Sequence, residues 1–329
     1  MLTKPLSPFK RMIRSGTLFS KQHVFFHVHD ILFLTHDILL SFREPRSGKY
    51  LIAMNKEGLC NRLKCLISSM RLAAKLSRTL ELYWPKNRSC NCRFSDLFEN
   101  KIVERRSEMS VRLLAGKTDK YLPVDTWRLL VFPGELSNHY AREHPSLYQS
   151  GHDIDFEYER IPFSIRNDYL KYVDRLSPLR YVREQVNTFS KAFDDGTISL
   201  SIRSWPEEDM RKDGLFRIEN VYRLVDKYNT ANFFVSSDAD WIVNRLILKY
   251  GRRILFHPKR KVASGRNSST GMQDILIDLL LLSRNKHLVA SYFSTFSELA
   301  WWFGGCKAKV EILENPADIE SFRMKFFAV

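Results

Sequence analysis

The sequence of 329 residues lacks the short motifs of several common enzyme classes. It contains no His-Glu-x-x-His, no Gly-x-Ser-x-Gly and no paired Cys-x-x-Cys, so metalloprotease, α/β-hydrolase and zinc-finger functions have no support. Neither a Gly-x-Gly-x-x-Gly run nor a Walker loop is present. The absence of an internal repeat of about 20–50 residues argues against a solenoid.

The sequence also lacks recognisable targeting and membrane-spanning segments. The N-terminus is basic but has no apolar run followed by small residues, so we expect no secretory signal. The most apolar early stretch, residues 24–42, is interrupted by histidines and by Asp30 and Asp37. These polar side chains argue against a transmembrane helix.

Cysteine is scarce, and its spacing fits no zinc site. The five cysteines are an odd number, and Cys90-Asn-Cys92 is too tight for the usual spacing of zinc ligands. We expect free thiols in a reducing compartment, which indicates a cytoplasmic protein. A disulfide involving Cys90 or Cys92 is the alternative.

Positive charge is what the chain has in excess. Its 52 basic and 37 acidic residues give a formal net charge of +15, and its hydrophobic content of 44% is enough for two cores. Such a charge attracts nucleic acid, anionic lipid or a phosphorylated substrate. Because the chain lacks the aromatic-basic motifs of RNA-binding modules, we expect no nucleic-acid partner.

A basic leader segment over residues 1–48 has two open interpretations. It either makes peripheral contact with the inner face of an anionic membrane or docks as a helix on the first domain. Its early cations, which precede an aromatic-rich stretch, are Lys4, Lys10, Arg11, Arg14 and Lys21.

A strand–helix–strand unit follows the leader. Residues 50–54 and 78–84 have the pattern of strands, and the apolar spacing of residues 63–76 predicts a helix between them. This order implies parallel strands. We place a Rossmann-like, acceptor-side domain at residues 49–175.

The second half predicts a longer alternation of strands and helices. This order is typical of a doubly wound sheet, which we place at residues 176–312, and we expect the tail 313–329 to pack back on the N-terminal domain. The predicted strands are 197–202, 231–236, 253–256 and 287–291, and the predicted helices are 218–228, 241–250, 270–283 and 299–303.

Polar residues stand at three predicted strand ends of the second half. Arg203, Asp238 and the Ser294-Thr295 turn follow three different strands, and ligands of open parallel sheets bind beyond such ends. An arginine offers two diphosphate oxygens a planar charge, and a helix start offers backbone N–H donors. The sequence therefore predicts an anion site, suited to a diphosphate.

Several of these residues also have structural interpretations. Thr295 and Glu298 fit a capping box at a helix start. Asp238-Ala-Asp240 resembles a metal-binding Asp-x-Asp, but we favour Asp238 or Asp240 as the N-cap of the next helix. Asp278 lies on a leucine-rich, buried helix and needs hydrogen-bond donors from the backbone or from a ligand.

Taken in order, these stretches resemble the fucosyltransferase superfamily, which includes α-1,6-fucosyltransferases, nodulation fucosyltransferases and protein O-fucosyltransferases. The N-terminal stretches that resemble the family are Gly58–Leu63, Leu76–Pro85 and Cys92–Phe98. Those that resemble its three later motifs are Ser201–Arg203, Val235–Asp238, and Ile277–Ser283 with Ser294–Ser297.

The resemblance implies a GT-B architecture, an α/β fold in which two Rossmann-like, doubly wound parallel-sheet domains face a cleft. It implies inverting transfer from GDP-fucose, with no required metal and no cofactor. The second domain would bind most of the nucleotide sugar.

The resemblance also implies roles for single residues. Arg203 would hold the β-phosphate and stabilise the leaving GDP, the turn at residues 294–296 would contact the diphosphate, Asp278 would accept from guanine, and Asn61 would face the sugar across the cleft. The full set of predicted donor-binding residues is Asn61, Ser201, Arg203, Asp238, Asp278, Ser294, Thr295 and Phe296.

One position departs from the family pattern. The family has a histidine two residues before the arginine, where this chain has Ser201. That histidine helps to position the guanine or its ribose, and serine is shorter and neutral. Another GDP-sugar, or a different nucleotide sugar, therefore stays open as the donor.

The predicted catalytic residues are Arg203 and the acidic residues that follow it. Glu207, Glu208 and Asp209 are candidates for a base that deprotonates the acceptor hydroxyl, with a solvated acidic loop as the alternative. We expect a glycan, glycolipid or lipopolysaccharide-like acceptor. A non-catalytic glycan- or nucleotide-binding descendant of the family is the alternative function.

Overall fold

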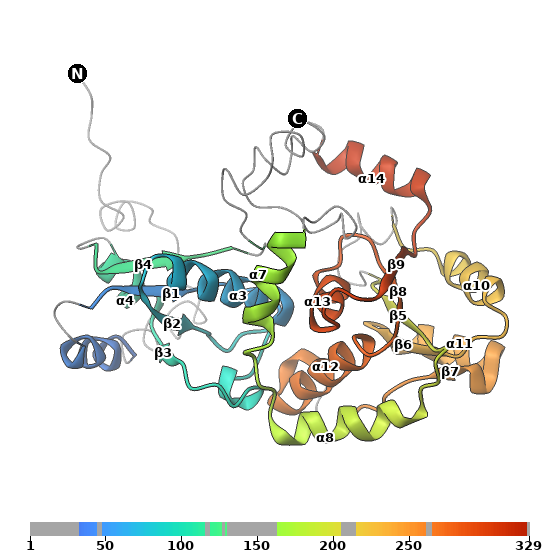
Figure 1. Ribbon diagram of the computed structural model, residues 1–329, viewed down its shortest axis with the longest axis horizontal. Coiled ribbons are helices and arrows are strands. Elements are labelled where there is room, and N and C mark those ends of the chain that lie inside the picture. The colour runs from blue at the N-terminus through green and yellow to red at the C-terminus, as the bar shows by residue number, and fades with distance from the viewer. Residues whose placement is uncertain are drawn as a thin grey trace, which may run out of the picture.

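Two parallel β-sheets form the framework of the molecule. The computed structural model describes residues 33–44, 48–115, 119–126, 129, 163–204, 215–260 and 265–327. Figure 1 shows one sheet at the left and the other at the right, with helices between them. The predicted α/β fold with two parallel-sheet domains is confirmed.

The first sheet has the strand order β3-β2-β1-β4. Its strands are β1 (Tyr50–Ala53), β2 (Thr79–Tyr83), β3 (Val103–Arg105) and β4 (Tyr121–Val124). Helix α3 (Leu59–Lys75) packs on one face and α4 (Glu108–Ala115) on the other. Because β1 pairs with β2 in parallel across α3, the predicted strand–helix–strand unit is confirmed.

The second sheet has the strand order β7-β6-β5-β8-β9, and all of its pairs are parallel. Helices cover both of its faces, as a doubly wound fold requires. Its strands are β5 (Ile198–Ile202), β6 (Phe233–Ser237), β7 (Ile254–Leu255), β8 (His287–Ala290) and β9 (Lys309–Ile312). One face carries α10 (Ile218–Lys227) and α11 (Asp240–Tyr250), and the other carries α8 (Arg180–Phe189), α12 (Ser269–Leu282) and α13 (Thr295–Phe303).

The remaining described elements connect these layers. They are α7 (Phe163–Val173), α14 (Pro316–Phe327), a helix over residues 33–43, and the short 3-10 helices η1 (Phe94–Asp96), η2 (Ser190–Ala192), η3 (Gly251–Arg253) and η4 (Gly265–Asn267). The Phe322 ring of α14 lies 6.3 Å from the ring of Tyr292 and 5.9 Å from that of Phe293. These contacts put α14 against the turn that follows β8, and packing of the tail on the N-terminal domain stays a prediction.

The helix over residues 33–43 is docked on the first domain. Asp37 is fully buried and accepts hydrogen bonds from the backbone N–H groups of Arg106 and Ser107 and from the hydroxyl of Ser110. Docking therefore describes this part of the predicted leader, and residues 1–32 lie outside the described part of the chain.

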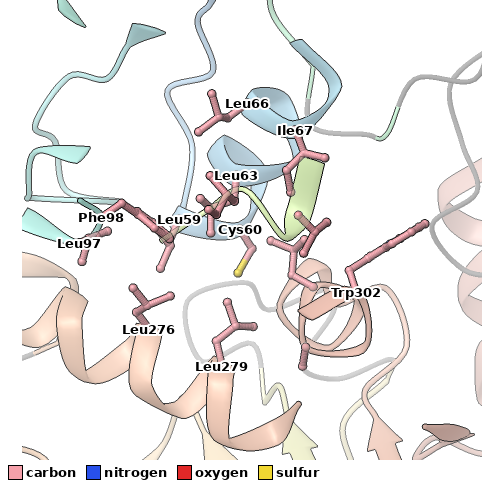
Figure 2. Close-up of a cluster of buried hydrophobic side chains, with 14 of the residues drawn as sticks. Leu59, Cys60, Leu63, Leu66, Ile67, Leu97, Phe98, Leu276, Leu279 and Trp302 are labelled. Carbon is pink, nitrogen blue, oxygen red and sulfur yellow. The ribbon is translucent and has the colours of Figure 1, made fainter. Parts of the chain in front are cut away.

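One continuous hydrophobic cluster joins the two domains. Figure 2 shows leucines of α3 above those of α12, with Trp302 of α13 beside them. Leu63 and Leu66 on α3 and Leu276 and Leu279 on α12 are all fully buried. Since a shared core excludes water from both halves, it fixes how the two sheets face each other.

A buried ion pair lies within this shared core. The Lys64 ammonium of α3 is 2.7 Å from the Glu298 carboxylate of α13, and the two side chains are 0% and 2% exposed. Each charge would be costly to bury alone, so each domain depends on the other for its partner. The pair connects α3 directly to α13.

Removing one member of this pair should destabilise the whole chain. We expect K64M to lower the free energy of unfolding by about 3–5 kcal/mol, because it leaves the Glu298 carboxylate buried without its cation. The double variant K64M/E298M should recover most of this loss. Urea denaturation measures both effects.

The matched control is K86M, since the Lys86 side chain is 47% exposed and lies 4.0 Å from Asp96. We expect this change to cost about 0–1 kcal/mol. Equal destabilisation by K64M and K86M would show that the buried pair does not hold the domains together.

Candidate functional site

The candidate site lies at the topological switch point of the second sheet. The chain leaves β5 toward β6 on one side, and the opposite neighbour of β5 is β8. Helices that cover opposite faces diverge at such a point and leave a crevice beyond the carboxyl ends of the strands. Arg203 follows β5, Asp238 follows β6 and the Ser294-Thr295 turn comes after β8. All three predicted strand ends therefore belong to adjacent strands.

Arg203 is held in position from two sides. Its backbone N–H donates to the Ser291 hydroxyl at 2.9 Å, which links the ends of β5 and β8. Its guanidinium pairs with the Asp238 carboxylate at the end of β6. Asp238 also accepts from the Ser204 N–H at 2.9 Å and from its hydroxyl at 2.7 Å.

The capping role expected for Asp238 or Asp240 is wrong. The residue at the N-cap of α11 is Ala239, without a side-chain cap, and Asp240 is the first helical residue. Asp238 instead uses its carboxylate on Arg203 and Ser204. Its physical function is therefore to orient the arginine, which the sequence did not indicate.

The turn after β8 opens directly into α13. Ser294 is the N-cap, and its hydroxyl accepts from the Ser297 N–H at 3.4 Å. Thr295 and Phe296 are the first two helical residues and are half-buried. Because N–H groups at a helix start have no partner within the helix, this turn presents donors and the positive end of a dipole.

The capping box expected from Thr295 and Glu298 is also wrong. Ser294 holds the cap position, and Glu298 lies in the interior, paired with Lys64. The preceding residue, Phe293, has a φ of 60°, in the left-handed region that a bulky residue rarely adopts. The turn is thus a constrained structure, held by its surroundings rather than by local propensity.

Ser201 is directed into the protein. Its side chain is buried, and the Ser297 hydroxyl donates to its hydroxyl oxygen at 2.8 Å. This bond ties β5 to the first turn of α13. Ser201 therefore helps to fix the start of α13 relative to β5.

Asp278 lies in a buried polar group at the ends of β6 and β7. It accepts from the Ser236 hydroxyl at 2.8 Å and forms an ion pair with Lys259. The His257 Nδ1 atom lies 3.8 Å from its other carboxylate oxygen, Oδ1. Both His257 Nδ1 and Asp278 Oδ1 are buried without a hydrogen-bond partner among the described residues.

The sequence missed His257 and Lys259 as members of this group. Burial lowers the pKa of His257, with partial compensation from the charge of Asp278, so the ring is held toward its neutral form. A neutral imidazole can donate through one nitrogen and accept through the other. The usable signal was their position just beyond the strand that ends at Leu255.

Asn61 lies on the first domain, in the first turn of α3. Its amide donates to the Glu57 carboxylate, and its Oδ1 atom is buried without a hydrogen-bond partner among the described residues. Glu207, Glu208 and Asp209 lie outside the described residues. The structure thus groups Arg203 and Asp238 with the α13 turn, keeps Asn61 on the other domain, and leaves the predicted base as a prediction.

Glu314 is a second residue that the sequence did not single out. It follows β9, is 4% exposed, and accepts from the Tyr292 N–H in the turn before α13 at 2.7 Å. Its Oε1 atom is buried without a hydrogen-bond partner among the described residues. Burial raises the pKa of Glu314 to about 7, although the Tyr292 N–H opposes this shift.

The described residues contain no group of three histidine, cysteine or acidic side chains arranged to hold a metal ion. All five cysteines are free thiols, and the sulfur atoms of Cys90 and Cys92 lie 3.7 Å apart. The independence from metal and cofactor that the resemblance implies stays a prediction.

Glu314 should make stability depend on pH. Its pKa in the folded chain is about 7, above an ordinary value of about 4.3. The folded state therefore binds more protons than the unfolded state between these values, and the free energy of unfolding falls as pH rises through this window. E314Q should abolish this part of the fall and stabilise the chain at pH 8, on the order of 3 kcal/mol, with little effect at pH 4.

Urea denaturation at both pH values measures this difference. E184Q is the control, because the Glu184 side chain is 56% exposed and pairs with Arg180 on the surface. If E314Q and E184Q have the same pH profile, Glu314 does not carry a raised pKa.

Comparison with known proteins identifies the fold. No protein-family model matches the chain, and no curated protein matches it by sequence. Among solved structures, the chain is similar to NodZ alpha-1,6-fucosyltransferase soaked with GDP-fucose, with 13% identity over 78% of this chain and 93% of that one, and a TM-score of 0.52.

It is also similar to the R284K mutant of Arabidopsis thaliana FUT1 in complex with GDP. The identity is 17% over 86% of this chain and 78% of that one, with a TM-score of 0.51. At these identities the likeness concerns the fold. The chain therefore has the two-domain α/β architecture of fucosyltransferases, as its motifs predict.

Proposed function

We propose that this chain is an inverting glycosyltransferase that transfers a sugar to a hydroxyl group of its acceptor. The first candidate donor is GDP-fucose, from which the enzyme would transfer fucose. The observation that carries the proposal is the pairing of Arg203 with Asp238 beside the helix start at Ser294. The fold neighbours, which were solved with GDP-fucose or GDP, add support.

The geometry suits a diphosphate for a physical reason. A leaving diphosphate gains charge as the sugar departs, and donors that are fixed in advance stabilise that charge without reorganising. The carboxylate of Asp238 fixes the guanidinium of Arg203, and the N–H groups of Thr295 and Phe296 point from the start of α13. The arginine and the helix start follow the neighbouring strands β5 and β8, which supports a shared diphosphate site.

In the proposed reaction, the acceptor hydroxyl oxygen forms a bond to the anomeric carbon while the bond to the phosphate oxygen breaks. The electron pair of that bond leaves with GDP, where Arg203 stabilises it. The hydroxyl proton passes to a base, for which Glu207, Glu208 and Asp209 are the proposed candidates. The configuration at the anomeric carbon inverts.

The proposed base subsite is the polar group around Asp278. A carboxylate with a buried, unpartnered oxygen suits the adjacent N–H donors of a guanine edge, and neutral His257 offers an additional contact. Since Ser201 hydrogen-bonds within the protein, it does not replace the family's histidine directly. A different nucleotide sugar is therefore the second candidate donor.

For the acceptor we propose a glycan, a glycolipid or a lipopolysaccharide-like molecule. The alternative is a non-catalytic protein that binds the nucleotide or glycan, and the inward orientation of Ser201 favours it. Turnover of a GDP-sugar by the purified chain distinguishes the two.

Donor binding should be visible as thermal stabilisation. GDP at about 100 times its dissociation constant should stabilise the chain by about 2.7 kcal/mol and raise its melting temperature by a few degrees. R203A should weaken GDP binding about 10- to 100-fold, because it removes charge-assisted hydrogen bonds of about 1.5–3 kcal/mol. Sugar transfer should fall at least as far.

The control is R252A. Arg252 is exposed in η3, which precedes the amino end of the edge strand β7, whereas Arg203 follows the carboxyl end of the central strand β5. This variant should bind GDP like the wild type. Absence of stabilisation by millimolar GDP, UDP and ADP alike, or unchanged binding by R203A, would refute the proposed diphosphate site.

Base recognition has its own test. If Asp278 accepts from both the ring N–H and the amino group of guanine, GDP should bind about tenfold or more tightly than IDP, which lacks the amino group. In D278N this ratio should approach one. Calorimetric titration with both nucleotides measures the ratio, and a preference that D278N leaves intact would assign guanine recognition to other residues.

A further inference from the structure

The helix over residues 33–43 buries a carboxylate and exposes three large apolar side chains. Asp37 is fully buried, whereas Ile38, Leu39 and Phe42 are 43%, 56% and 81% exposed. These three apolar residues are spaced by three and four along the helix, so they lie on one face. Surface helices usually have the reverse arrangement. We call Ile38, Leu39 and Phe42 the apolar stripe.

A buried polar network prevents the helix from turning this stripe inward. Asp37 accepts from two backbone N–H groups at the start of α4. The Arg105 guanidinium, also buried, donates to the Asp37 carbonyl and to the Ser41 hydroxyl, each at 2.9 Å, and pairs with Glu44. Rotating the helix would break these bonds and leave buried charges without partners. The network therefore keeps the stripe on the exposed side of the helix.

Cations lie on one flank of the stripe. A groove of about 320 Å³ lies between this helix and the edge strand β3, and its lining includes His36, Val103, Arg93 and Arg106, with Glu104 as its acidic member. Arg43 at the end of the helix is exposed, as are Arg93 and Arg106. The surface therefore combines an apolar ridge with a basic margin.

We propose that this face docks on the surface of an anionic lipid bilayer. The apolar stripe enters the boundary between headgroups and acyl chains, and Arg43, Arg93 and Arg106 meet the lipid phosphates. Among the described residues no helix is long and apolar enough to cross a bilayer. The proposal concerns a surface on the first domain and does not depend on the proposed transfer reaction.

Two observations favour a bilayer over a protein partner. The stripe is narrow and has a basic margin, which matches a bilayer surface, where an apolar region lies beneath anionic headgroups. Stable protein interfaces, in contrast, bury broader surfaces and are depleted of charge at their centres. The sequence before the helix, residues 1–32, adds five cations and only one carboxylate, Asp30. Basic and apolar signals together give stable binding where either alone is weak.

The experiment is co-sedimentation of the full chain with vesicles of phosphatidylcholine alone or mixed with phosphatidylglycerol. We expect binding to the anionic vesicles, with weakening at high salt. The double variant L39S/F42S should lower the partition coefficient about tenfold or more, because it removes two side chains from the bilayer boundary.

The matched control is L248S. Leu248 lies on α11 in the second domain and is 87% exposed, so its loss removes similar apolar surface from another face. Ile38→Ser alone is a milder variant in case the double one is unstable, and it should lower binding in the same direction.

Three results would overturn the proposal. The wild type does not bind the anionic vesicles; the stripe variants bind like the wild type and L248S; or the wild type self-associates without lipid while L39S/F42S is monomeric. The last result would assign the stripe to an interface between copies of the chain.

Discussion

The buried pair between Lys64 and Glu298 is the interaction on which the site geometry depends. Glu298 lies four residues after Ser294, within the same short helix whose start belongs to the proposed diphosphate site. Lys64 belongs to the first domain. The proposed site is thus attached to both domains, and any relative motion of the domains must move a buried charge pair and the apolar core around it. Such a core resists continuous deformation because its packing is dense.

Arg203 is also fixed by partners from distant parts of the chain. Its guanidinium, its backbone N–H and the following serine are each bound by groups at the ends of neighbouring strands. An exposed arginine would lose rotamer freedom on meeting a ligand, whereas this one has lost most of it already. Preorganisation of this kind lowers the entropic cost of binding. In this arrangement Asp238 acts through Arg203 and does not itself contact the ligand.

The sequence predicted the elements well because their signals are local. The apolar spacing of α3 and the alternating strands and helices of the second half appear in short windows of residues. The strand ends that carry Arg203 and Ser294 followed from the rule for parallel sheets. The capping roles expected for Asp238, Thr295 and Glu298 were wrong, because capping preferences are local and do not include the charged partners that the tertiary structure brings near.

The partners of other residues could not have been found without the strand order. Glu314 reaches the α13 turn because β9 is the neighbour of β8, and His257 reaches Asp278 because β7 is the neighbour of β6. Nothing local to either residue specifies that neighbour. The orientation of the helix over residues 33–43 also depends on partners distant in sequence, because the buried network of Asp37 and Arg105 turns Ile38, Leu39 and Phe42 outward.

The proposed diphosphate site does not depend on the net charge of the chain. Arg203 is matched by Asp238, and the nearby Glu314 carries a proton for part of the time near neutral pH because burial raises its pKa to about 7. The charges of Arg203 and Asp238 therefore offset each other at the proposed site. In the proposed binding of a diphosphate, the affinity comes from oriented N–H donors and a fixed guanidinium, which act at short range. The proposed contact with an anionic bilayer instead uses the excess positive charge of the chain, because attraction to a charged layer acts over a longer range.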